Sequence, residues 1–267
     1  NGYTAQQSSE LNGWFREEYP QDTKAQVALA KFLNGEMAAL SDYRVLLASN
    51  AKETKPYLHT FSESTVGQPI EQFDFDGRRF SRSSLNYLLG LAMLKKHLNG
   101  DVPHTVLEIG GGFGILGEIL TSTGIDDVRY IDIDIPPMNY VAQYFLSEIL
   151  GKENVASYAQ TRDLLNIEIN QLPAASVLCS WQIEKLQGNV DLFVNFISFQ
   201  EMEPHIVKNY LEQVSRLDPG WVWLRNIREG KQLKSDKNSF GVETQIMTND
   251  YREMIHGNEL VEHNVKQ

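Results

Sequence analysis

The sequence predicts an α/β protein with a parallel sheet, preceded by a mainly helical segment. Two observations support the sheet: residues 105–120 read as a short strand, a glycine-rich turn and a helix, and residues 127–134 and 190–197 read as further apolar strands. Strands that alternate with helical stretches indicate βαβ units, whose parallel sheets carry helices on both faces. The third observation concerns residues 1–60, where apolar side chains follow helical spacing and no such strand–turn–helix unit occurs.

The glycine-rich turn is the most informative part of the sequence. It contains Gly110, Gly111, Gly112 and Gly114, and Glu108 lies near the end of the strand before it. Glycine allows positive φ and lets a ligand approach the backbone, and the helix that follows offers free N–H groups and a partial positive charge. A carboxylate is costly to bury there unless a cation or a hydrogen-bond donor meets it. We therefore expect a ligand site at this turn.

The composition limits the classes of function. The chain has 267 residues, 42% hydrophobic and 22% charged, enough for one α/β core with an extra layer. A formal net charge of −11 disfavours a DNA or RNA partner, because phosphate binding needs a basic surface. No apolar run approaches the roughly 20 residues that span a bilayer. The single cysteine, Cys179, excludes an internal disulfide and fits a reducing compartment, so we expect a cytoplasmic protein, although a chain that begins at Asn1 leaves a removed leader open.

The first 100 residues are expected to form a domain of their own. We expect residues 1–100 to be a mainly helical cap or lid with a hairpin near 70–82, and residues 101–267 to be the ligand-binding domain. Asp76-Gly77 between two alternating segments is typical of a hairpin turn. Three arginines near this hairpin could hold a phosphate or carboxylate of a substrate or pair with nearby acids: Arg78, Arg79 and Arg82, of which Arg79 and Arg82 are the expected substrate residues.

Turn and capping residues predict where the other elements begin and end. The helix after the hairpin is expected to be capped by Ser83 or Ser84 and to end at Asn99-Gly100. The third strand of the sheet is either 155–158 or, as we prefer, 175–179, which has the small and β-branched residues of a buried parallel strand. Residues 221–225 are expected to form a fifth strand, and residues 259–265 at least one closing strand.

The second strand carries two acidic residues at its end. A carboxylate at this position is expected to accept hydrogen bonds from the ribose of a nucleoside ligand. Asp132 and Asp134 are both candidates, and because side chains alternate along a strand, both lie on the same face. Periodicity alone does not choose between them.

Three stretches resemble known enzymes. E-x-G-x-G-x-G at residues 108–114 resembles motif I of the class I S-adenosylmethionine (SAM) methyltransferases. Residues 130–151, Y-I-D-I-D-I-P-P-M-N-Y-V-A-Q-Y-F-L-S-E-I-L-G, and S-F-Q-E-M at 198–202 resemble a bacterial family of sugar O-methyltransferases. The resemblance implies a Rossmann-like, seven-stranded methyltransferase sheet with helices on both faces. It also implies methyl transfer from SAM, leaving S-adenosylhomocysteine, to a hydroxyl of a sugar or glycan in polysaccharide biosynthesis.

The same resemblance implies a set of cofactor-binding residues. It aligns Asp134 with the acidic residue of the family and makes Asp132 an additional one. Ser180, Trp181 and Gln182 would border the adenine, where Trp181 either stacks on the ring or belongs to the core. The full expected set is Glu108, Gly110, Gly111, Gly112, Gly114, Asp132, Ile133, Asp134, Ser180, Trp181, Gln182, Asn195 and Ser198.

A sugar hydroxyl needs a base or a metal ion before it can attack the methyl group. We expect Glu201 and His205 to be the candidates for the base, with Glu201 as an alternative able to orient the histidine instead. The two share one face at i, i+4 if the helix begins near Gln200. Gln200 is included among the catalytic and substrate residues, and Arg225 among the substrate residues. A divalent metal held by Glu201, Glu203 and His205 is an alternative that we do not favour, and one cysteine excludes a thiolate zinc site.

Two other functions are compatible with parts of the pattern. Gly112 to Gly117 satisfies G-x-G-x-x-G, and an acid follows about 20 residues later, which is typical of NAD(P)-dependent oxidoreductases. Glu108 before the glycines and the lack of a Y-x-x-x-K pair disfavour this class. The other alternative is a methyltransferase-like domain that only binds other proteins. The acceptor is expected to be a small molecule or a glycan, and a homo-oligomer is left open.

Overall fold

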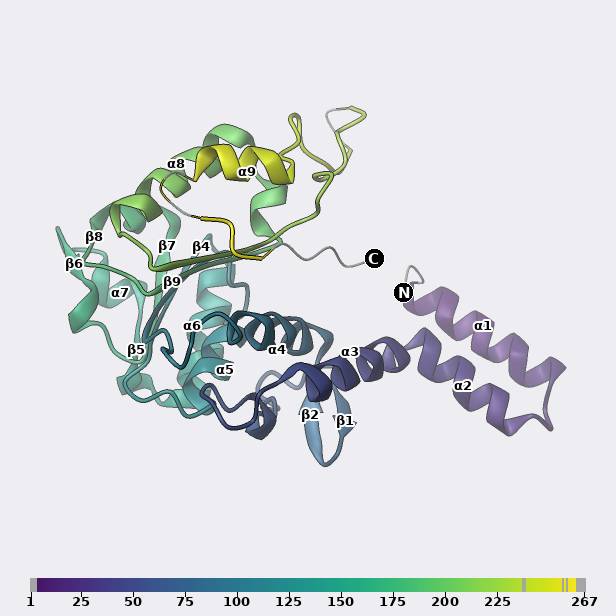
Figure 1. The fold of residues 1–267 in the computed structure, drawn as a ribbon. Coiled ribbons are helices and arrows are strands. Elements are labelled where there is room, and N and C mark those ends of the chain that lie inside the picture. Colours follow the sequence, from purple (N-terminus) through teal and green to yellow (C-terminus); the bar gives the residue numbers. More distant parts are fainter. Residues whose placement is uncertain (1–3, 237–238, 256, 258, 263–267) are drawn as a thin grey trace. The chain divides into compact units, whose positions relative to one another are not determined.

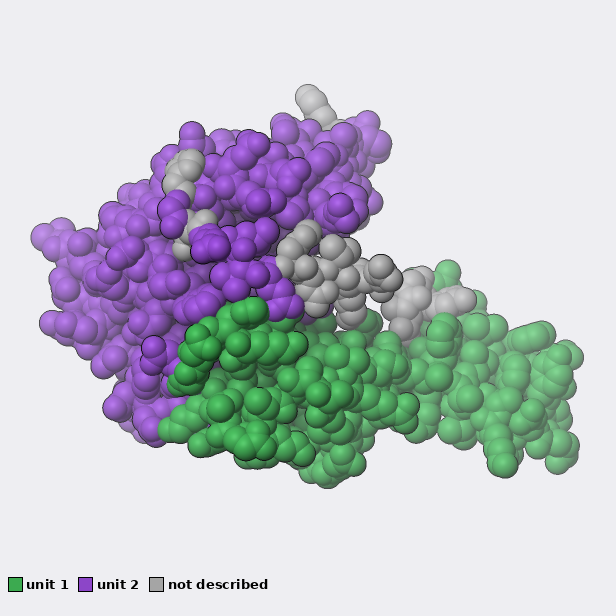
Figure 2. All heavy atoms as spheres, viewed as in Figure 1, with its two compact units in different colours: residues 1–100 green, residues 101–267 purple. Residues whose placement is uncertain are grey.

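The chain divides into two compact units, residues 1–100 and 101–267, in a computed structural model that describes residues 4–236, 239–255, 257 and 259–262 (Figure 1, Figure 2). The first unit is mainly helical and contains one small hairpin. The second unit contains the parallel sheet. Among the described residues, no helix combines the length and the apolar character needed to cross a membrane.

The N-terminal unit begins with three helices, α1 (Ala5–Glu18), α2 (Thr23–Leu33) and α3 (Glu36–Ser49). Capping side chains set where the first two begin: the Thr4 hydroxyl accepts from the N–H of Gln7, and Asp22 accepts from that of Ala25. A short 3-10 turn, η1 (Leu58–Thr60), follows. The helical pattern of the sequence is therefore realised as separate short helices.

The hairpin predicted around Asp76-Gly77 is present, formed by the antiparallel strands β1 (Phe73–Phe75) and β2 (Arg78–Phe80). Tyr43 on α3 secures it. The Tyr43 hydroxyl donates a hydrogen bond to Asp76 Oδ2 at 2.6 Å and accepts one from Arg78 Nη2 at 2.7 Å. The hairpin is thus fastened to the helices by a hydrogen-bonded triad as well as by apolar contact.

The next helix, α4 (Arg82–Leu94), differs from the prediction at both ends. Its cap is Ser81, whose hydroxyl accepts from the N–H of Ser84 at 3.0 Å, and neither Ser83 nor Ser84 is the cap. The helix stops at Leu94 and does not reach Asn99-Gly100. The residues after Leu94 form tight turns, because the N–H groups of residues 96 and 97 bond to carbonyls three residues back.

The C-terminal unit is built on a six-stranded sheet in the order β10-β9-β3-β4-β7-β5, and every neighbouring pair is parallel. The α/β fold class predicted from the sequence is confirmed. Residues 155 and 175 both begin strands, so the two alternatives for the third strand are neighbours in the sheet. The strands are β3 (Thr105–Ile109), β4 (Arg129–Asp134), β5 (Val155–Ala156), β7 (Ala175–Cys179), β9 (Leu192–Phe196) and β10 (Trp221–Arg225).

The strand count is a correction, because seven strands were expected and this sheet has six in the described part of the chain. The missing member is the closing strand predicted at 259–265. Residues 259–262 form no strand, and residues 263–265 lie outside the described residues.

Helices cover both faces of the sheet. On one face, α8 (Pro204–Arg216) and α9 (Thr248–Met254) bury apolar side chains against β3, β4, β7 and β9. On the other face, Gly117 of α5 (Ile115–Ser122) lies close to both the ring of Tyr130 in β4 and the side chain of Leu146 in α6 (Met138–Leu150). Figure 1 shows α8 and α9 above the strands and α5 and α6 below them. The sheet is therefore buried on both sides, which explains its nearly unbroken apolar strands.

Short elements complete this unit. They are η2 (Lys152–Asn154), α7 (Tyr158–Thr161), β6 (Ile167–Glu168), η3 (Ile169–Gln171), η4 (Ser180–Lys185), β8 (Leu186–Gln187) and η5 (Ser198–Glu201). The strands β6 and β8 pair with each other outside the main sheet.

The order of the strands determines where a ligand can bind. From β3 the chain moves to β4 on one side, and it later returns to β9 on the other side of β3. Ligands of open parallel sheets bind beyond the carboxyl ends of the strands at such a reversal. The glycine turn follows β3 at this point.

Candidate functional site

The glycine turn has a conformation that only glycine adopts easily. Gly110, Gly112 and Gly114 have φ values of 75°, 64° and 91°. The N–H of Gly111 donates to Asp132 Oδ1 at 3.1 Å, and the N–H of Gly112 donates to Asp134 Oδ2 at 3.0 Å. The two aspartates that were predicted to bind a ribose therefore both hold the turn in place.

Gly111 lies over a cluster of polar atoms. A Cβ at Gly111 would come within 2.5 Å of the Tyr130 hydroxyl, 2.6 Å of Asp132 Oδ1 and 2.9 Å of Glu108 Oε2. Real Cβ atoms are not found at such distances, so this position needs glycine for space. Tyr130 was not predicted to belong to the site. Strand alternation could have indicated it, because Tyr130 lies two residues before Asp132 on the same face.

The carboxyl groups of Glu108 and Asp132 are completely buried. The Tyr130 hydroxyl donates to Glu108 Oε2 at 2.6 Å, while Asp132 Oδ2 has no hydrogen-bond partner among the described residues. Burial is the main reason that the pKa of Asp132 lies well above its ordinary value of 3.8, and the carboxylates of Glu108 and Asp134 raise it further. The N–H of Gly111 acts in the opposite direction.

Asp134 lies nearer to the surface. Its Oδ1 accepts from the N–H of Ile135 at 2.7 Å, and its pKa is also raised, mainly by burial. Of the two acids, Asp134 is partly exposed and Asp132 is not. Only Asp134 is therefore placed to reach a ligand directly.

The carboxyl end of β9 is tied to β3 by side chains. Asn195 donates to the carbonyl of Ile109 at 2.9 Å and to Ser198 Oγ at 2.6 Å, and Ser198 Oγ in turn bonds to the same carbonyl. Asn226, after β10, donates to Asn195 Oδ1 at 3.0 Å. Asn195 and Ser198, both expected to bind the cofactor, thus hold the two strand ends next to the glycine turn. Asn226 was not predicted.

Exposed apolar side chains follow the strand ends around this turn. Ile197, directly after β9, is half-exposed and has a φ of 69°, which is rare for a β-branched residue. Strained residues of this kind are often found at functional sites. Apolar residues within two positions of the ends of β4, β7 and β10 are also exposed: Ile135, Trp181 and Ile227. This edge of the sheet therefore offers apolar contact surface beside the polar turn.

The predicted helical pairing of Glu201 and His205 is wrong. Glu201 ends the 3-10 turn η5, Met202 and Glu203 are extended, and α8 begins only at Pro204. The residue before a proline is disfavoured in the helical region, which separates the two segments. Lys231 forms an ion pair with Glu201 at 2.9 Å, while His205 is exposed on the first turn of α8.

Three other predicted residues occupy different places from those expected. Gln200 is buried, and its Oε1 accepts from the N–H of Ile227 at 2.7 Å. Gln182 is buried as well, and its amide bonds to the N–H of Cys179 and to Thr161 Oγ1. Ile133 belongs to the apolar core that faces α8. The structure therefore gives these three side chains packing and bracing positions and turns none of them toward a ligand.

The remaining predicted residues retain accessible surface. Trp181 is 53% exposed and makes an edge-to-face contact with Tyr158, so it is not a core residue. Ser180 is partly exposed at the start of η4. Arg225 lies over the ring of Phe196. Arg79 and Arg82 belong to the N-terminal unit, where Arg79 Nε donates to the carbonyl of Glu63 at 3.1 Å.

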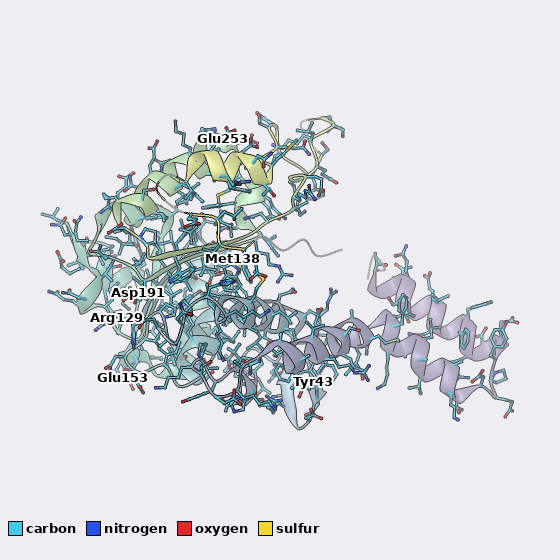
Figure 3. The ribbon with its side chains drawn as sticks, in the orientation of Figure 1. Tyr43, Arg129, Met138, Glu153, Asp191 and Glu253 are labelled. Atoms are coloured by element: carbon cyan, nitrogen blue, oxygen red, sulfur yellow. The ribbon has the colours of Figure 1, made fainter. Side chains whose placement is uncertain are left out.

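The opposite edge of the sheet carries different chemistry. Figure 3 labels Arg129 and Asp191, which lie near the amino ends of β4 and β9. It also labels Met138, the first residue of α6, which follows the carboxyl end of β4. Asp191 Oδ2 accepts from the N–H groups of His104 and Thr105, both at 2.8 Å. These contacts tie the amino ends of β3 and β9 together.

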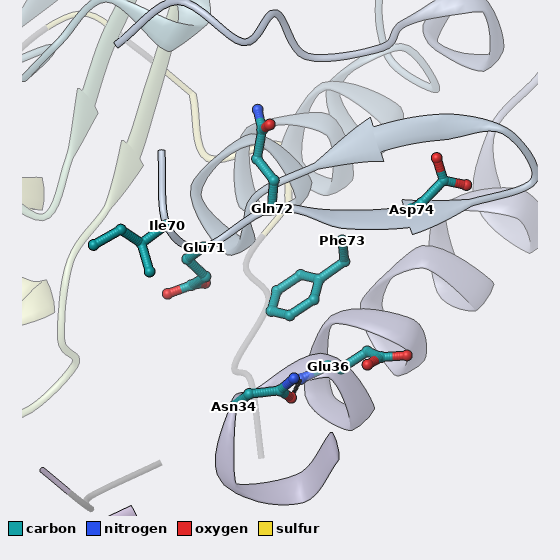
Figure 4. A pocket seen from close by; sticks show the side chains of 7 residues that line it. All are labelled: Asn34, Glu36, Ile70, Glu71, Gln72, Phe73 and Asp74. Atoms are coloured by element: carbon teal, nitrogen blue, oxygen red, sulfur yellow. Dashed lines mark hydrogen bonds between the residues drawn. The ribbon is translucent and has the colours of Figure 1, made fainter. Parts of the chain in front are cut away.

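Neither of two surface cavities coincides with the glycine turn. One, of about 550 Å³, lies in the N-terminal unit and is lined by Asn34, Glu36, Ile70, Glu71, Gln72, Phe73 and Asp74 (Figure 4). The other, of about 310 Å³, is lined partly by Pro219, Gly220 and Val222, at the amino end of β10. The described residues contain no group of three or more His, Cys, Asp or Glu side chains arranged to hold a metal ion.

Comparison with known proteins gives structural neighbours only. No protein-family profile and no curated protein sequence matches the chain. Similar solved structures include the mitomycin 7-O-methyltransferase MmcR (12% identity, TM-score 0.31), the SAM-dependent methyltransferase SibL (12%, 0.38) and PigF with SAH (11%, 0.36). The similarity with MmcR covers 71% of this chain and 49% of MmcR. For SibL the two shares are 90% and 69%, and for PigF they are 80% and 61%. The chain thus spans about half the length of MmcR. Similarity at this level assigns no activity, so the functional argument rests on the site.

Proposed function

We propose that the chain is a SAM-dependent methyltransferase that transfers a methyl group to a hydroxyl of a sugar or glycan. One observation carries the proposal: the glycine turn lies where the strand order reverses, and two successive N–H groups of the turn are held by aspartates of the next strand. The resemblance to motif I and the strand after it in such enzymes leads us to expect Glu108 before the glycines and acids at positions 132 and 134. The sugar class comes from the resemblance of residues 130–151 and 198–202 alone.

The residues around the turn fit this cofactor. SAM, when bound, supplies a methyl group on a positively charged sulfur. The orphaned oxygen of Asp132 and the acid pair behind the turn favour a cationic ligand. In the proposal Asp134 accepts hydrogen bonds from the ribose, Trp181 stacks on the adenine, and the turn gives the ligand close access to the backbone.

Methyl transfer requires the protein to align the acceptor oxygen with the methyl group and to supply a base for the hydroxyl proton. The acceptor oxygen must be held about 3 Å from the methyl carbon and in line with the breaking bond. We assign the base to His205, because an imidazole can accept the hydroxyl proton and this one is exposed on the first turn of α8, the helix that follows the carboxyl end of β9. Glu201, already paired with Lys231, is assigned to acceptor binding on the neighbouring turn.

Calorimetric titration with S-adenosylhomocysteine, and with NADH in parallel, tests the cofactor. Binding of S-adenosylhomocysteine is expected. It should be lost in Gly112→Val, because a β-branched residue cannot easily adopt the φ of 64° and the Gly112 N–H would leave Asp134. Binding of NADH alone would replace the proposal by an oxidoreductase. Binding of neither would indicate a non-catalytic domain.

Transfer of labelled methyl from SAM to a panel of sugars and glycans tests the reaction. His205→Ala is expected to keep S-adenosylhomocysteine binding and to reduce transfer by about 100-fold or more, the usual contribution of a general base. Lys208→Ala, an exposed substitution on the same helix, is the matched control. Unchanged transfer in His205→Ala would exclude His205 as the base.

A further inference from the structure

The C-terminal unit contains two fully buried carboxyl groups directly behind the glycine turn. Glu108 and Asp132 face each other as register partners in the neighbouring parallel strands β3 and β4, and neither is exposed to solvent. Two ionised carboxylates at such a place lose their hydration and repel each other. A single proton held by the pair removes the repulsion and the desolvation cost of one of the two charges.

The hydrogen bonds indicate which carboxyl group holds that proton. Glu108 Oε2 already accepts a hydrogen bond from the Tyr130 hydroxyl, which stabilises a negative charge there. Asp132 Oδ1 accepts one from the N–H of Gly111, whereas Asp132 Oδ2 has no partner in the described part of the chain. An ionised Asp132 would leave a buried charged oxygen without a donor. A protonated Asp132 leaves only a neutral hydroxyl in that place.

The charged neighbours of Asp132 among the described residues raise its pKa. The charged groups that act on Asp132 are acids, Glu108 from β3 and Asp134 from its own strand. On the other side, β7 places Val177 beside Asp132 and Cys179 beside Asp134. The titratable groups of the other elements packed on β4 include Glu118 of α5, Tyr140, Tyr144 and Glu148 of α6, and Glu184 and Lys185 of η4, where Lys185 Nζ bonds to the carbonyls of Arg162 and Leu164. On the face covered by α8, Tyr210 interacts with Asp134, and burial raises the pKa of its hydroxyl.

We propose that Glu108 and Asp132 hold one proton between them in the ligand-free protein, on Asp132, and that a cationic sulfonium ligand at the glycine turn releases it. The inference rests on the proposed function for the identity of the ligand. The raised pKa of Asp132, caused first by burial and then by its acidic neighbours, agrees with it. On release the O–H bond of Asp132 breaks, the proton passes to the solvent buffer, and the negative charge that remains behind the turn attracts the positive charge of the ligand.

This linkage has a consequence for the two forms of the cofactor. S-adenosylhomocysteine carries a neutral thioether in place of the sulfonium, so it brings one positive charge less to the turn. It is expected to release a smaller fraction of the proton. Raising the pH should therefore strengthen binding of SAM relative to S-adenosylhomocysteine, by up to about tenfold for each pH unit while the pair is titrating.

Two measurements test the inference separately. The first is the infrared spectrum of the ligand-free protein at neutral pH, in which a buried protonated carboxyl group gives its own carbonyl band. This band is expected in the unmodified protein and in Asp134→Asn, and it should be absent in Asp132→Asn. Asp134→Asn is the matched control, because Asp134 also accepts a hydrogen bond from the turn but has donors to both its oxygens. No such band, or one that survives in Asp132→Asn, would overturn the shared proton.

The second measurement is calorimetric titration of the intact protein with SAM and with S-adenosylhomocysteine in buffers of different ionisation enthalpy. The dependence of the heat on the buffer gives the number of protons released. We expect more protons released with SAM than with S-adenosylhomocysteine, and no difference in Asp132→Asn. Equal release for both ligands would overturn the linkage while leaving the methyltransferase proposal intact. Binding of neither ligand would overturn the linkage together with the proposed function. The infrared spectrum would still show whether Asp132 is protonated in the ligand-free protein.

Discussion

Ser198 occupies the space that a side chain on Gly110 would need. A Cβ at Gly110 would lie 2.2 Å from Ser198 Oγ and 2.4 Å from its Cβ. The same Ser198 hydroxyl bonds to the carbonyl of Ile109, at 3.0 Å, so it joins the end of β9 to the end of β3. The glycine turn is therefore shaped by two constraints, the conformation of its own backbone and the close approach of the neighbouring strand end.

Gly110→Ala is predicted to be strongly destabilising and to abolish ligand binding at the turn. The alanine would have to adopt a φ of 75°, at a cost of about 1–2 kcal/mol, and would also displace Ser198 from Ile109. We expect a total loss of about 3 kcal/mol in the free energy of unfolding, within the range for overpacking. Urea unfolding measures the loss.

Gly112→Ala is the matched control for that substitution. Gly112 has a similar φ of 64°, but a Cβ there would meet no atom within 4 Å. Only the conformational cost, about 1–2 kcal/mol, should appear. If both alanine variants lowered the free energy of unfolding equally, the close approach of Ser198 to Gly110 would not contribute to the loss.

Asp132→Asn is predicted to change how stability depends on pH. Because the folded protein holds the Asp132 proton at a pKa well above 3.8, the stability contributed by this proton is complete below pH 3.8 and is lost as the pH rises through the folded pKa. Asparagine can still accept the Gly111 hydrogen bond but does not titrate. The variant should therefore be more stable than the unmodified protein at neutral pH, with the difference vanishing near pH 3.8. Thermal unfolding across this range measures it, and a larger difference at the acidic end would contradict the prediction.

Gln200→Ala is predicted to lower stability, because the structure gives Gln200 a bracing position between η5 and the residues after β10. Removing the amide leaves the N–H of Ile227 without its acceptor, which costs about 1–3 kcal/mol. Gln200→Glu keeps an oxygen in this position, and because a buried carboxylate is costly it should recover the loss only at a pH low enough to protonate it. Thermal unfolding of the two variants distinguishes this role from a catalytic one, for which alanine would reduce transfer without lowering stability.

The framework of the site could be predicted because it depends on local patterns. The apolar run before Gly110 and the glycines after it specify a strand, a turn and a helix without reference to distant residues. The position of Asp132 and Asp134 at the end of the second strand could also be predicted from the local pattern. Their partners could not be predicted, since it is the pairing of β3 with β4 that brings Glu108 opposite Asp132.

The errors arose where a local pattern allowed two conformations. Glu201 and His205 have helical spacing, but Pro204 starts a new helix and the backbone before it is extended. The preference of residues before proline was available in the sequence and would have separated them. Gln182 and Gln200 were placed in the site because they follow strands, and only tertiary packing shows that their side chains turn inward.

Lys95→Met is predicted to loosen the N-terminal unit, because one buried ammonium group organises the segment after α3. Lys95 Nζ donates to Asn50 Oδ1 and to the carbonyls of Ala51, Thr54 and Pro56, at distances of 2.6 to 3.0 Å. Burial lowers the Lys95 pKa, which partly offsets the value of these bonds. Methionine would fill similar space but leave the carbonyls without a donor, so we expect a loss of about 2 kcal/mol in the free energy of unfolding.

Lys96→Met, at the exposed neighbouring position, is the control and should change the free energy of unfolding by less than about 0.5 kcal/mol. Urea unfolding of both variants makes the comparison, and equal losses would show that the carbonyl cluster does not depend on Lys95.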